Sequence, residues 1–149
     1  MALHIPEVFK DFLRLLDTHG VEYLLIGGYA VAFHGYPRAT ADMDIFIAAN
    51  PENAARMNAV VKEFGFDVPD LSPDVFLKDE HKIIRMGLPP LRIEIMMAVS
   101  GVGFQECYEK RIEYKDGDLT IKIIDKENLK KNKKAAARYK DLSDLDYLP

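Results

Sequence analysis

The amino-acid sequence predicts a mixed β-sheet flanked by helices, of the α/β or α+β class. Apolar segments with the two-residue alternation of β-strands recur along the chain, as at residues 42–48 and 91–97. A segment with the helical i, i+3, i+4, i+7 spacing begins at residue 9. Turn sequences join two pairs of strand segments, whereas helical segments join the others, so we expect a mixed sheet with helices packed on it.

The N-terminal half is expected to hold two longer helices with a strand–helix–strand unit between them. Pro6 suits the first turn of a helix, and Gly20 lies just past its end, where a left-handed backbone costs little. Asn50, followed by a proline, starts a second helix that is expected to end at Gly65. Between them we expect a buried strand at residues 21–26, a short helix at 29–34 and a strand at 42–48.

The C-terminal half is expected to hold two hairpins and further helices. Ser72-Pro73 repeats the helix-start signal, and residues 104–110 form a short helix candidate. Asp125 can cap a final helix that runs through a lysine-rich stretch toward Leu148. A Gly-Leu-Pro-Pro turn and an Asp-Gly turn each lie between two strand segments. The strands of these hairpins are expected at residues 81–86, 91–97, 112–114 and 119–123.

Length, charge and cysteine content narrow the class of protein. The 149 residues, 48% of them apolar, fit a single globular domain over residues 1–149. The net charge of −4 gives no general attraction to nucleic acid or to an anionic membrane, so such a partner would have to meet a local patch. The longest apolar run, residues 23–33, is shorter than the ~20 residues of a membrane span. A single cysteine, Cys107, excludes an internal disulfide. We therefore expect a cytoplasmic protein.

Two aspartates in one predicted strand are the first candidate functional residues. Asp42 and Asp44 project from the same face of the strand, with Met43 and Ile45 on the other. Like charges in this arrangement raise each other's pKa unless a cation lies between them. Magnesium prefers such oxygen ligands and completes its shell with water and phosphate. The pair therefore predicts a site for Mg²⁺ or Mn²⁺ that also binds a phosphate-containing substrate.

A glycine pair precedes the aspartates, between a strand and a short helix. Without side chains at Gly27 and Gly28, a polyphosphate can approach backbone N–H groups at the positive end of that helix. Taken separately, a Gly-Gly pair is usually a turn and an Asp-x-Asp sequence is usually solvated surface. Together in one strand–helix–strand unit they indicate phosphoryl or nucleotidyl transfer.

The segment from residue 26 to residue 45 resembles the signature of the DNA polymerase β-like nucleotidyltransferase superfamily. The matching residues are Ile26-Gly27-Gly28 and Asp42-Met43-Asp44-Ile45, separated by a long gap. Arg38 and Thr40 before the aspartates, and residues 140–145 near the C-terminus, are similar to minimal bacterial and archaeal members, including those akin to abortive-infection toxins. The resemblance implies a nucleotidyltransferase fold with a C-terminal helical extension.

The resemblance also implies roles for the carboxylates. Asp42 and Asp44 would hold two magnesium ions, one of which positions a nucleoside triphosphate. The other ion, with Glu94 on a neighbouring strand, would activate an acceptor hydroxyl. Apolar neighbours flank Glu94 in the same alternation that flanks the aspartates, although an exposed acid at a strand edge is the alternative interpretation.

Several other residues have two interpretations each. Arg38 could pair with a phosphate or anchor its loop, and Thr40 could hydrogen-bond near the metal ions or cap the strand. On one continuous C-terminal helix, Lys133 and Lys140 would lie two turns apart on one face and Arg138 elsewhere. Lys133 and Lys140 are therefore the first candidates for a contact with the triphosphate. A solvated helix face and a contact with RNA are the alternatives.

Two hypotheses of function follow. The first is a magnesium-dependent enzyme that moves a nucleoside monophosphate from ATP or another triphosphate to an acceptor hydroxyl, on a protein, an RNA or a small molecule. The second is a binding module that keeps the fold without turnover, such as one half of a toxin–antitoxin pair in contact with a helical partner protein. The small size of the chain suggests that a homodimer or a partner completes the substrate cleft.

Overall fold

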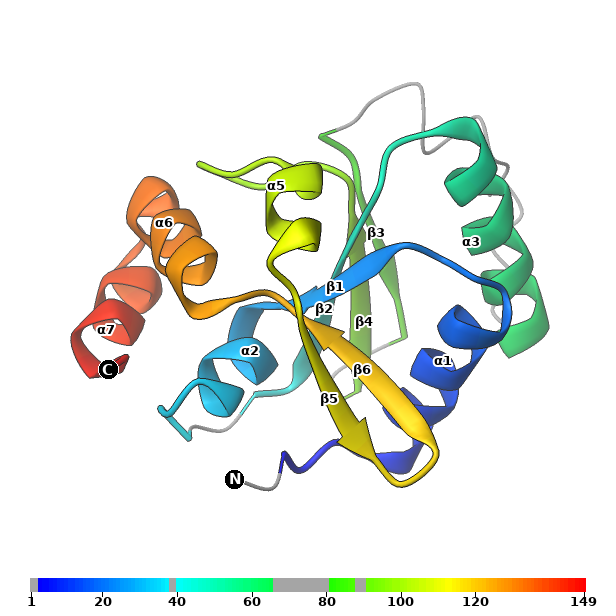
Figure 1. Ribbon diagram of the computed structural model, residues 1–149, viewed down its shortest axis with the longest axis horizontal. Helices are drawn as coiled ribbons and strands as arrows, with labels where there is room; N and C mark the ends of the chain where they lie inside the picture. Colours follow the sequence, from blue (N-terminus) through cyan, green and yellow to red (C-terminus); the bar gives the residue numbers. More distant parts are fainter. Residues whose placement is uncertain (1–2, 38–39, 66–80, 88–90) are drawn as a thin grey trace.

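A computed structural model describes residues 3–37, 40–65, 81–87 and 91–149 of the chain. It contains a mixed six-stranded sheet in the order β3-β4-β2-β1-β6-β5, with helices packed around it (Figure 1). The predicted fold class is therefore confirmed. In chain order the elements are α1 (Glu7–Thr18), β1 (Tyr23–Ile26), α2 (Gly27–Phe33), β2 (Asp42–Ile47), α3 (Pro51–Phe64), β3 (Ile83–Met86), β4 (Arg92–Met96), α5 (Phe104–Glu109), β5 (Ile112–Asp116), β6 (Leu119–Ile123), α6 (Lys126–Ala136) and α7 (Tyr139–Tyr147).

The sheet combines antiparallel and parallel pairs. β1 pairs antiparallel with β2 and parallel with β6, and β2 pairs parallel with β4. The two expected antiparallel pairs are present as β3 with β4 and β5 with β6. In Figure 1, α1 and α3 lie together to the right of the sheet, while α6 and α7 lie to its left, beyond α2. The helical piece expected to start at Ser72-Pro73 lies outside the described residues.

Local sequence signals account for the helix boundaries. The side chain of Asn50 accepts a hydrogen bond from the backbone N–H of Asn53 (2.9 Å), which caps α3, and Gly65 ends the same helix with a φ of 96°. Asp125 caps α6 through the N–H of Asn128 in the same way. Among the described residues, none of the helices has the length and apolar character needed to cross a membrane.

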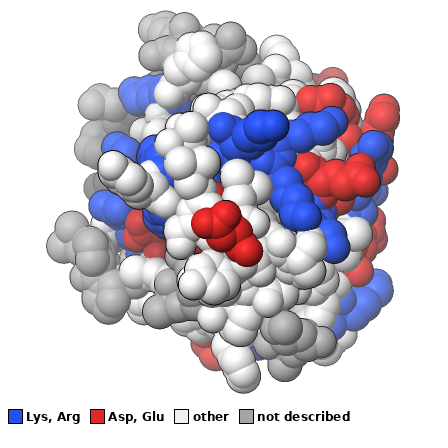
Figure 2. Space-filling model, turned by 90° about the vertical axis from the view of Figure 1, so that its left-hand side faces the viewer, with Lys and Arg blue, Asp and Glu red and all other residues white. Residues whose placement is uncertain are grey.

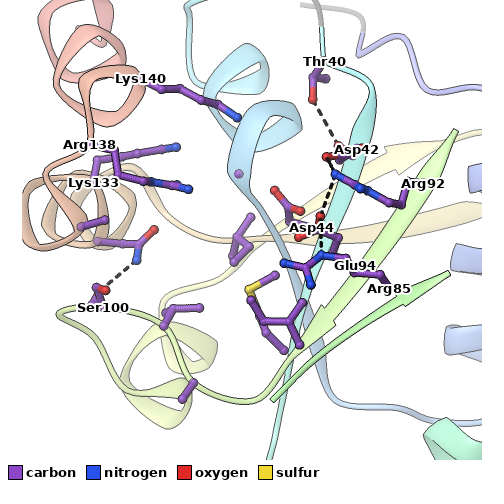
Figure 3. Close-up of a pocket in the computed structure, with 18 of the residues that line it drawn as sticks. Thr40, Asp42, Asp44, Arg85, Arg92, Glu94, Ser100, Lys133, Arg138 and Lys140 are labelled. Atoms are coloured by element: carbon purple, nitrogen blue, oxygen red, sulfur yellow. Dashed lines mark hydrogen bonds and ion pairs between the residues drawn. The ribbon is translucent and has the colours of Figure 1, made fainter. Parts of the chain in front are cut away.

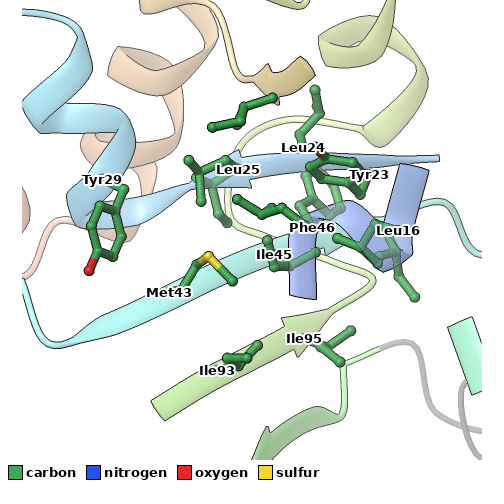
Figure 4. Close-up of a cluster of buried hydrophobic side chains, with 14 of the residues drawn as sticks. Leu16, Tyr23, Leu24, Leu25, Tyr29, Met43, Ile45, Phe46, Ile93 and Ile95 are labelled. Carbon is green, nitrogen blue, oxygen red and sulfur yellow. The ribbon is translucent and has the colours of Figure 1, made fainter. Parts of the chain in front are cut away.

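At β2 and β4 one face of the sheet is buried, and this burial accounts for the alternation in the sequence. Met43 and Ile45 of β2 are buried beside Ile93 and Ile95 of β4, with which they are in register (Figure 4). Side chains from α1, including Leu16, cover this face. Because successive residues of a strand point to opposite faces, burying these apolar residues turns the residues between them to the other face.

The C-terminal region differs from the prediction of one continuous helix. α6 ends at Ala136, and Ala137 adopts a left-handed conformation with a φ of 54°. The chain then turns, and α7 packs against α6 (Figure 1). The helical pattern of the sequence continues across the break, but contacts between the two helices favour the turned arrangement. The prediction that Lys133 and Lys140 lie two turns apart on one helix is therefore wrong.

Candidate active site

Charged side chains of β2, β3 and β4 lie on the face of the sheet opposite Met43 and Ile45. In the parallel register of β2 and β4, Asp42 lies beside Arg92 and Asp44 lies beside Glu94. The antiparallel register of β3 and β4 adds Arg85, which lies beside Glu94. The structure thus brings the three acidic residues that we singled out in the sequence to one face, on two adjacent strands.

These side chains form one wall of a cavity of about 700 Å³. The opposite wall comes from the C-terminal helices and the short connection between them, which contribute Lys133, Arg138 and Lys140 (Figure 3). Thr40 lies at the edge of the cavity, where its hydroxyl donates a hydrogen bond to the backbone carbonyl of Asp42 (3.2 Å). The cavity therefore has a mainly acidic wall on the sheet and a basic wall on the helices.

Asp44 is the most perturbed carboxylate of this cavity. Its pKa is raised from 3.8 to about 6, first because the group is buried and second because the charge of Glu94 is close. The charges of Lys140 and Lys133 act in the opposite direction but do not cancel these effects. Within the described part of the chain, Asp44 makes no ion pair at 4 Å or less, so its negative charge has no direct partner.

Gly27, the first residue of α2, makes room for Asp44. It has a φ of 68°, which residues with a side chain rarely adopt. A Cβ atom at this position would overlap the carboxylate of Asp44. Gly28 is buried in the same turn of helix. The sequence predicts these glycines as an approach for a polyphosphate; at Gly27 the structure shows a second reason for glycine, the close contact with Asp44.

Arg92 compensates part of the acidic charge, which we did not foresee from the sequence. Its Nη2 atom lies 2.9 Å from Oδ2 of Asp42 and 3.2 Å from Oε1 of Glu94. The Nε atom of Arg85 lies 3.5 Å from the same oxygen of Glu94. The acidic face therefore has two positive partners of its own, Arg92 and Arg85. The signal was present, because Arg92 precedes Glu94 by two residues and so shares its face.

Lys133 has a different position from the one we expected. Its side chain is 4% exposed, and its ammonium group lies 3.2 Å from both Asp141 and Asp144 of α7. The guanidinium of Arg138 donates two hydrogen bonds to the same Asp141, of 2.7 and 3.2 Å. Burial acts to raise the pKa of Asp141, but the hydrogen bonds from Arg138 and Lys133 outweigh burial and lower it. Lys133 therefore holds α6 and α7 together, at the base of the basic wall.

Lys140 is an exposed side chain of that wall, and within the described ranges it makes no ion pair. Figure 2 views the molecule from the α6–α7 side and shows lysine and arginine side chains gathered there, with acidic side chains beside them. Exposed basic residues of the C-terminal region are Lys126, Lys131, Lys134, Arg138 and Lys140.

The remaining candidates lie outside the chemistry of the cavity or outside the described residues. Arg38 falls in the second group. Cys107 is buried, and burial raises the pKa of its thiol to about 12, so it is not a thiolate at neutral pH. His34 makes a 2.6 Å hydrogen bond with the backbone carbonyl of Ile124 and is not part of the cavity lining.

The donor set of the cavity fits a hard divalent cation. Over residues 3–37, 40–65, 81–87 and 91–149, no three His, Cys, Asp or Glu side chains form a closed metal-binding cluster. Magnesium, however, usually takes one or two carboxylates and completes its shell with water and substrate phosphate. Asp42 and Asp44 offer two carboxylates on one face, and a cation beside Asp44 would stabilise its ionised form, which burial and then the charge of Glu94 disfavour.

Comparisons with known proteins find matches to solved structures but no match by sequence. No protein-family model matches the chain, and no curated protein matches its sequence. A crystal structure of a proposed nucleotidyltransferase (TM1012) from Thermotoga maritima superposes with a TM-score of 0.57 at 14% identity, over 94% of this chain and 85% of that one. An antigenic nucleotidyltransferase-like protein from Paracoccidioides brasiliensis superposes with a TM-score of 0.55 at 14% identity, over 95% and 73% of the two chains. The chain therefore has the nucleotidyltransferase fold.

Proposed function

We propose that the protein is a metal-dependent nucleotidyltransferase that transfers a nucleoside monophosphate from a nucleoside triphosphate, with ATP as the first candidate, to an acceptor hydroxyl. The observation that carries this proposal is the register of β2 and β4. It places Glu94 beside Asp44, so that Glu94, Asp44 and Asp42 share one polar face. The basic wall formed by Arg138 and Lys140 lies across the cavity from these acids. One wall suits a metal ion and the other suits phosphate groups.

In this proposal each group of the chain has a separate task. Asp42 and Asp44 would hold Mg²⁺ or Mn²⁺, which when bound neutralises phosphate charge and acidifies a hydroxyl. Lys140 and Arg138 would bind phosphate oxygens. Glu94 would accept the proton of the acceptor hydroxyl as its oxygen bonds to the α-phosphorus. The bond between the α-phosphorus and the bridging oxygen breaks, and pyrophosphate leaves with that oxygen.

Gly27 and Gly28 would assist through the backbone. They form the first turn of α2, whose N–H groups carry the positive end of the helix dipole. This end lies next to Asp44, because the carboxylate of Asp44 occupies the space beside Gly27. A phosphate held by a cation on Asp44 would therefore have peptide N–H groups within the same region of the cavity.

A binding module without turnover is the second candidate, and two observations favour it. Arg92 already neutralises part of the acidic face, so the carboxylates have a role in stability without a metal ion. On α7, Tyr139 is 95% exposed and Leu142 is 46% exposed, which offers an apolar surface to a partner. Such a partner could be a helical protein, as in a toxin–antitoxin pair, or a second copy of this chain.

A transfer assay separates the two candidates. The protein would be incubated with each of the four ribonucleoside triphosphates, labelled on the α-phosphate, with Mg²⁺ and with RNA, protein extract or aminoglycosides as acceptors. We expect a covalent label on one acceptor class and the release of pyrophosphate, both lost in Asp44→Asn. Absence of label on every acceptor, together with absence of nucleotide binding, would favour the binding module.

A further inference from the structure

The guanidinium of Arg92 occupies the oxygens that a metal ion would need. Its Nη2 atom bridges Oδ2 of Asp42 and Oε1 of Glu94, at 2.9 and 3.2 Å (Figure 3). A divalent cation on Asp42 would bring two positive charges to the same oxygen atoms. At such short separations two cations repel each other strongly even in a partly solvated cavity. Arg92 and a metal ion therefore compete for Asp42.

One hydrogen-bond donor of Arg92 lacks an acceptor among the described residues in this arrangement. Its Nε atom is buried and has no hydrogen-bond partner in the part of the chain that the structure describes. Nε and Nη2 form one edge of the guanidinium, the edge that binds two oxygens of a carboxylate or a phosphate side by side. Of this edge, only Nη2 is hydrogen-bonded here. A phosphate group would satisfy both donors at once.

The side chain of Arg92 also has space to move within the cavity. It lines the same cavity as Lys140 and Arg138, and its side chain is 31% exposed, so it can move without leaving the cavity. Its neighbour Arg85 still contacts Glu94 at 3.5 Å, so Glu94 keeps a positive partner when Arg92 leaves. Movement of Arg92 therefore uncovers Asp42 without leaving the neighbouring acid unpaired.

We infer that Arg92 is an exchangeable ligand of the active site: it pairs with Asp42 and Glu94 when no substrate is present and moves to the triphosphate when the metal–nucleotide complex binds. This inference rests on the proposed function, since it assumes that a metal ion and a nucleotide share the cavity. It assigns Arg92 two opposing effects. Arg92 weakens binding of the metal ion alone and strengthens binding of the nucleotide with its metal ion.

The opposing effects distinguish this role from a purely structural ion pair. Removal of the Arg92 charge should increase the affinity for Mg²⁺ alone about three- to tenfold, because the competitor is gone. The same change should decrease the affinity for a metal–triphosphate complex about tenfold or more, because a charge-assisted contact with phosphate is lost. A purely structural ion pair would also release Asp42 for Mg²⁺ when the charge is removed, but its removal would not weaken binding of the metal–triphosphate complex.

Calorimetry on Arg92→Gln tests the inference with two titrations, MgCl₂ alone and a non-hydrolysable ATP analogue in excess Mg²⁺. Arg92→Lys keeps the charge without the two-donor edge and should restore only part of the nucleotide affinity. Arg14→Gln removes the same charge from an exposed ion pair with Asp11 on α1, outside the cavity, and should change neither affinity. Unchanged or weaker binding of Mg²⁺ to Arg92→Gln would overturn the inference.

A measurement on the wild-type protein covers the case in which Arg92→Gln does not fold. With ¹⁵N-labelled arginine, the side-chain N–H signal of Arg92 should shift when the metal–nucleotide complex is added, and the signal of Arg14 should not. An Arg92 signal that stays in place although calorimetry shows the complex bound would overturn the inference and leave the proposed function intact. A transfer assay in which no acceptor becomes labelled, in contrast, would contradict the proposed function.

Discussion

The carboxylate of Asp44 occupies the space in which a side chain at position 27 would lie. Gly27 adopts a φ of 68°, and a Cβ atom at that position would overlap the Asp44 carboxyl group. The first residue of α2 and the second acid of β2 are therefore coupled by direct contact. Glycine at position 27 serves both the backbone conformation and the placement of the carboxylate.

Gly27→Ala should destabilise the protein more than the same change at Gly20, which has nearly the same φ of 67° but no neighbouring atom within 4 Å of the place that a Cβ would take. We expect about 1 to 2 kcal/mol for Gly20→Ala, from the left-handed backbone alone. Gly27→Ala should add about 1 to 3 kcal/mol for the overlap with Asp44. Urea denaturation measures both, and most of the excess should vanish in an Asp44→Ala background. Equal costs at the two glycines would contradict the coupling.

Asp44→Asn should stabilise the protein at neutral pH in the presence of a chelator. The folded-state pKa of Asp44, about 6, lies above its ordinary value of 3.8, so the folded protein binds the proton more tightly than the unfolded chain does. Wild-type stability is therefore highest below pH 4 with respect to this group and falls as pH rises through about 6. The shift of about two pKa units corresponds to at most about 3 kcal/mol.

The expected curve is a difference in unfolding free energy between Asp44→Asn and wild type that is near zero at pH 4 and about 1 to 3 kcal/mol in favour of the variant at pH 8. Thermal and urea unfolding over this pH range give the curve. A variant that is less stable than wild type at pH 8 would show that the ionised carboxylate makes net favourable contacts.

Lys133→Met should destabilise the C-terminal helices. The substitution leaves Asp141 and Asp144 buried without the lysine that contacts both, and breaking a buried ion pair of this kind costs about 3 to 5 kcal/mol. Lys134→Met changes an exposed residue of the same helix and should stay within about 0.5 kcal/mol of wild type. Limited proteolysis between α6 and α7 would report the local effect. A stable Lys133→Met protein with weakened nucleotide binding would return Lys133 to the role that we expected from the sequence.

Lys140→Ala should weaken nucleotide binding without affecting the fold. Lys140 is exposed and lines the cavity, where its charge acts on Asp44. We expect a loss of about three- to tenfold in affinity for a metal–triphosphate complex at low salt and a smaller loss at about 0.5 M salt, because salt screens an exposed charge. Lys134→Ala, with its charge on the same helical region but outside the cavity lining, is the control. Equal affinities for the two variants would remove Lys140 from the binding site.

The strands and the acidic face could be predicted from the sequence because they follow from local alternation. Burying Met43 and Ile45 on one face fixes Asp42 and Asp44 on the other, and the same reasoning applies to Glu94 between Ile93 and Ile95. Once β2 and β4 pair in parallel, the acids face the same cavity. The hairpins followed from their turn sequences for the same local reason.

The basic wall could not be predicted in the same way, because it depends on contacts between distant elements. Ala137 gives no signal for a left-handed turn, and Lys133 is buried only because α7 folds back and presents two carboxylates to it. The pairing of Arg92 with Asp42 depends on the register between β2 and β4, fifty residues apart in the chain. The alternation within one strand gives its two faces, but it does not say which distant strand will lie beside it.

Calorimetric titration of a non-hydrolysable ATP analogue, with Mg²⁺ and with a chelator in its place, tests whether Asp42 and Asp44 bind a metal–nucleotide complex. We expect the wild-type protein to bind the analogue only when Mg²⁺ is present, and Asp42→Asn plus Asp44→Asn to lose that binding. Since Asp44→Asn is expected to stabilise the fold, a circular dichroism spectrum like that of wild type should accompany the loss. Metal-dependent binding that is unchanged in the double variant would show that neither aspartate holds the metal ion.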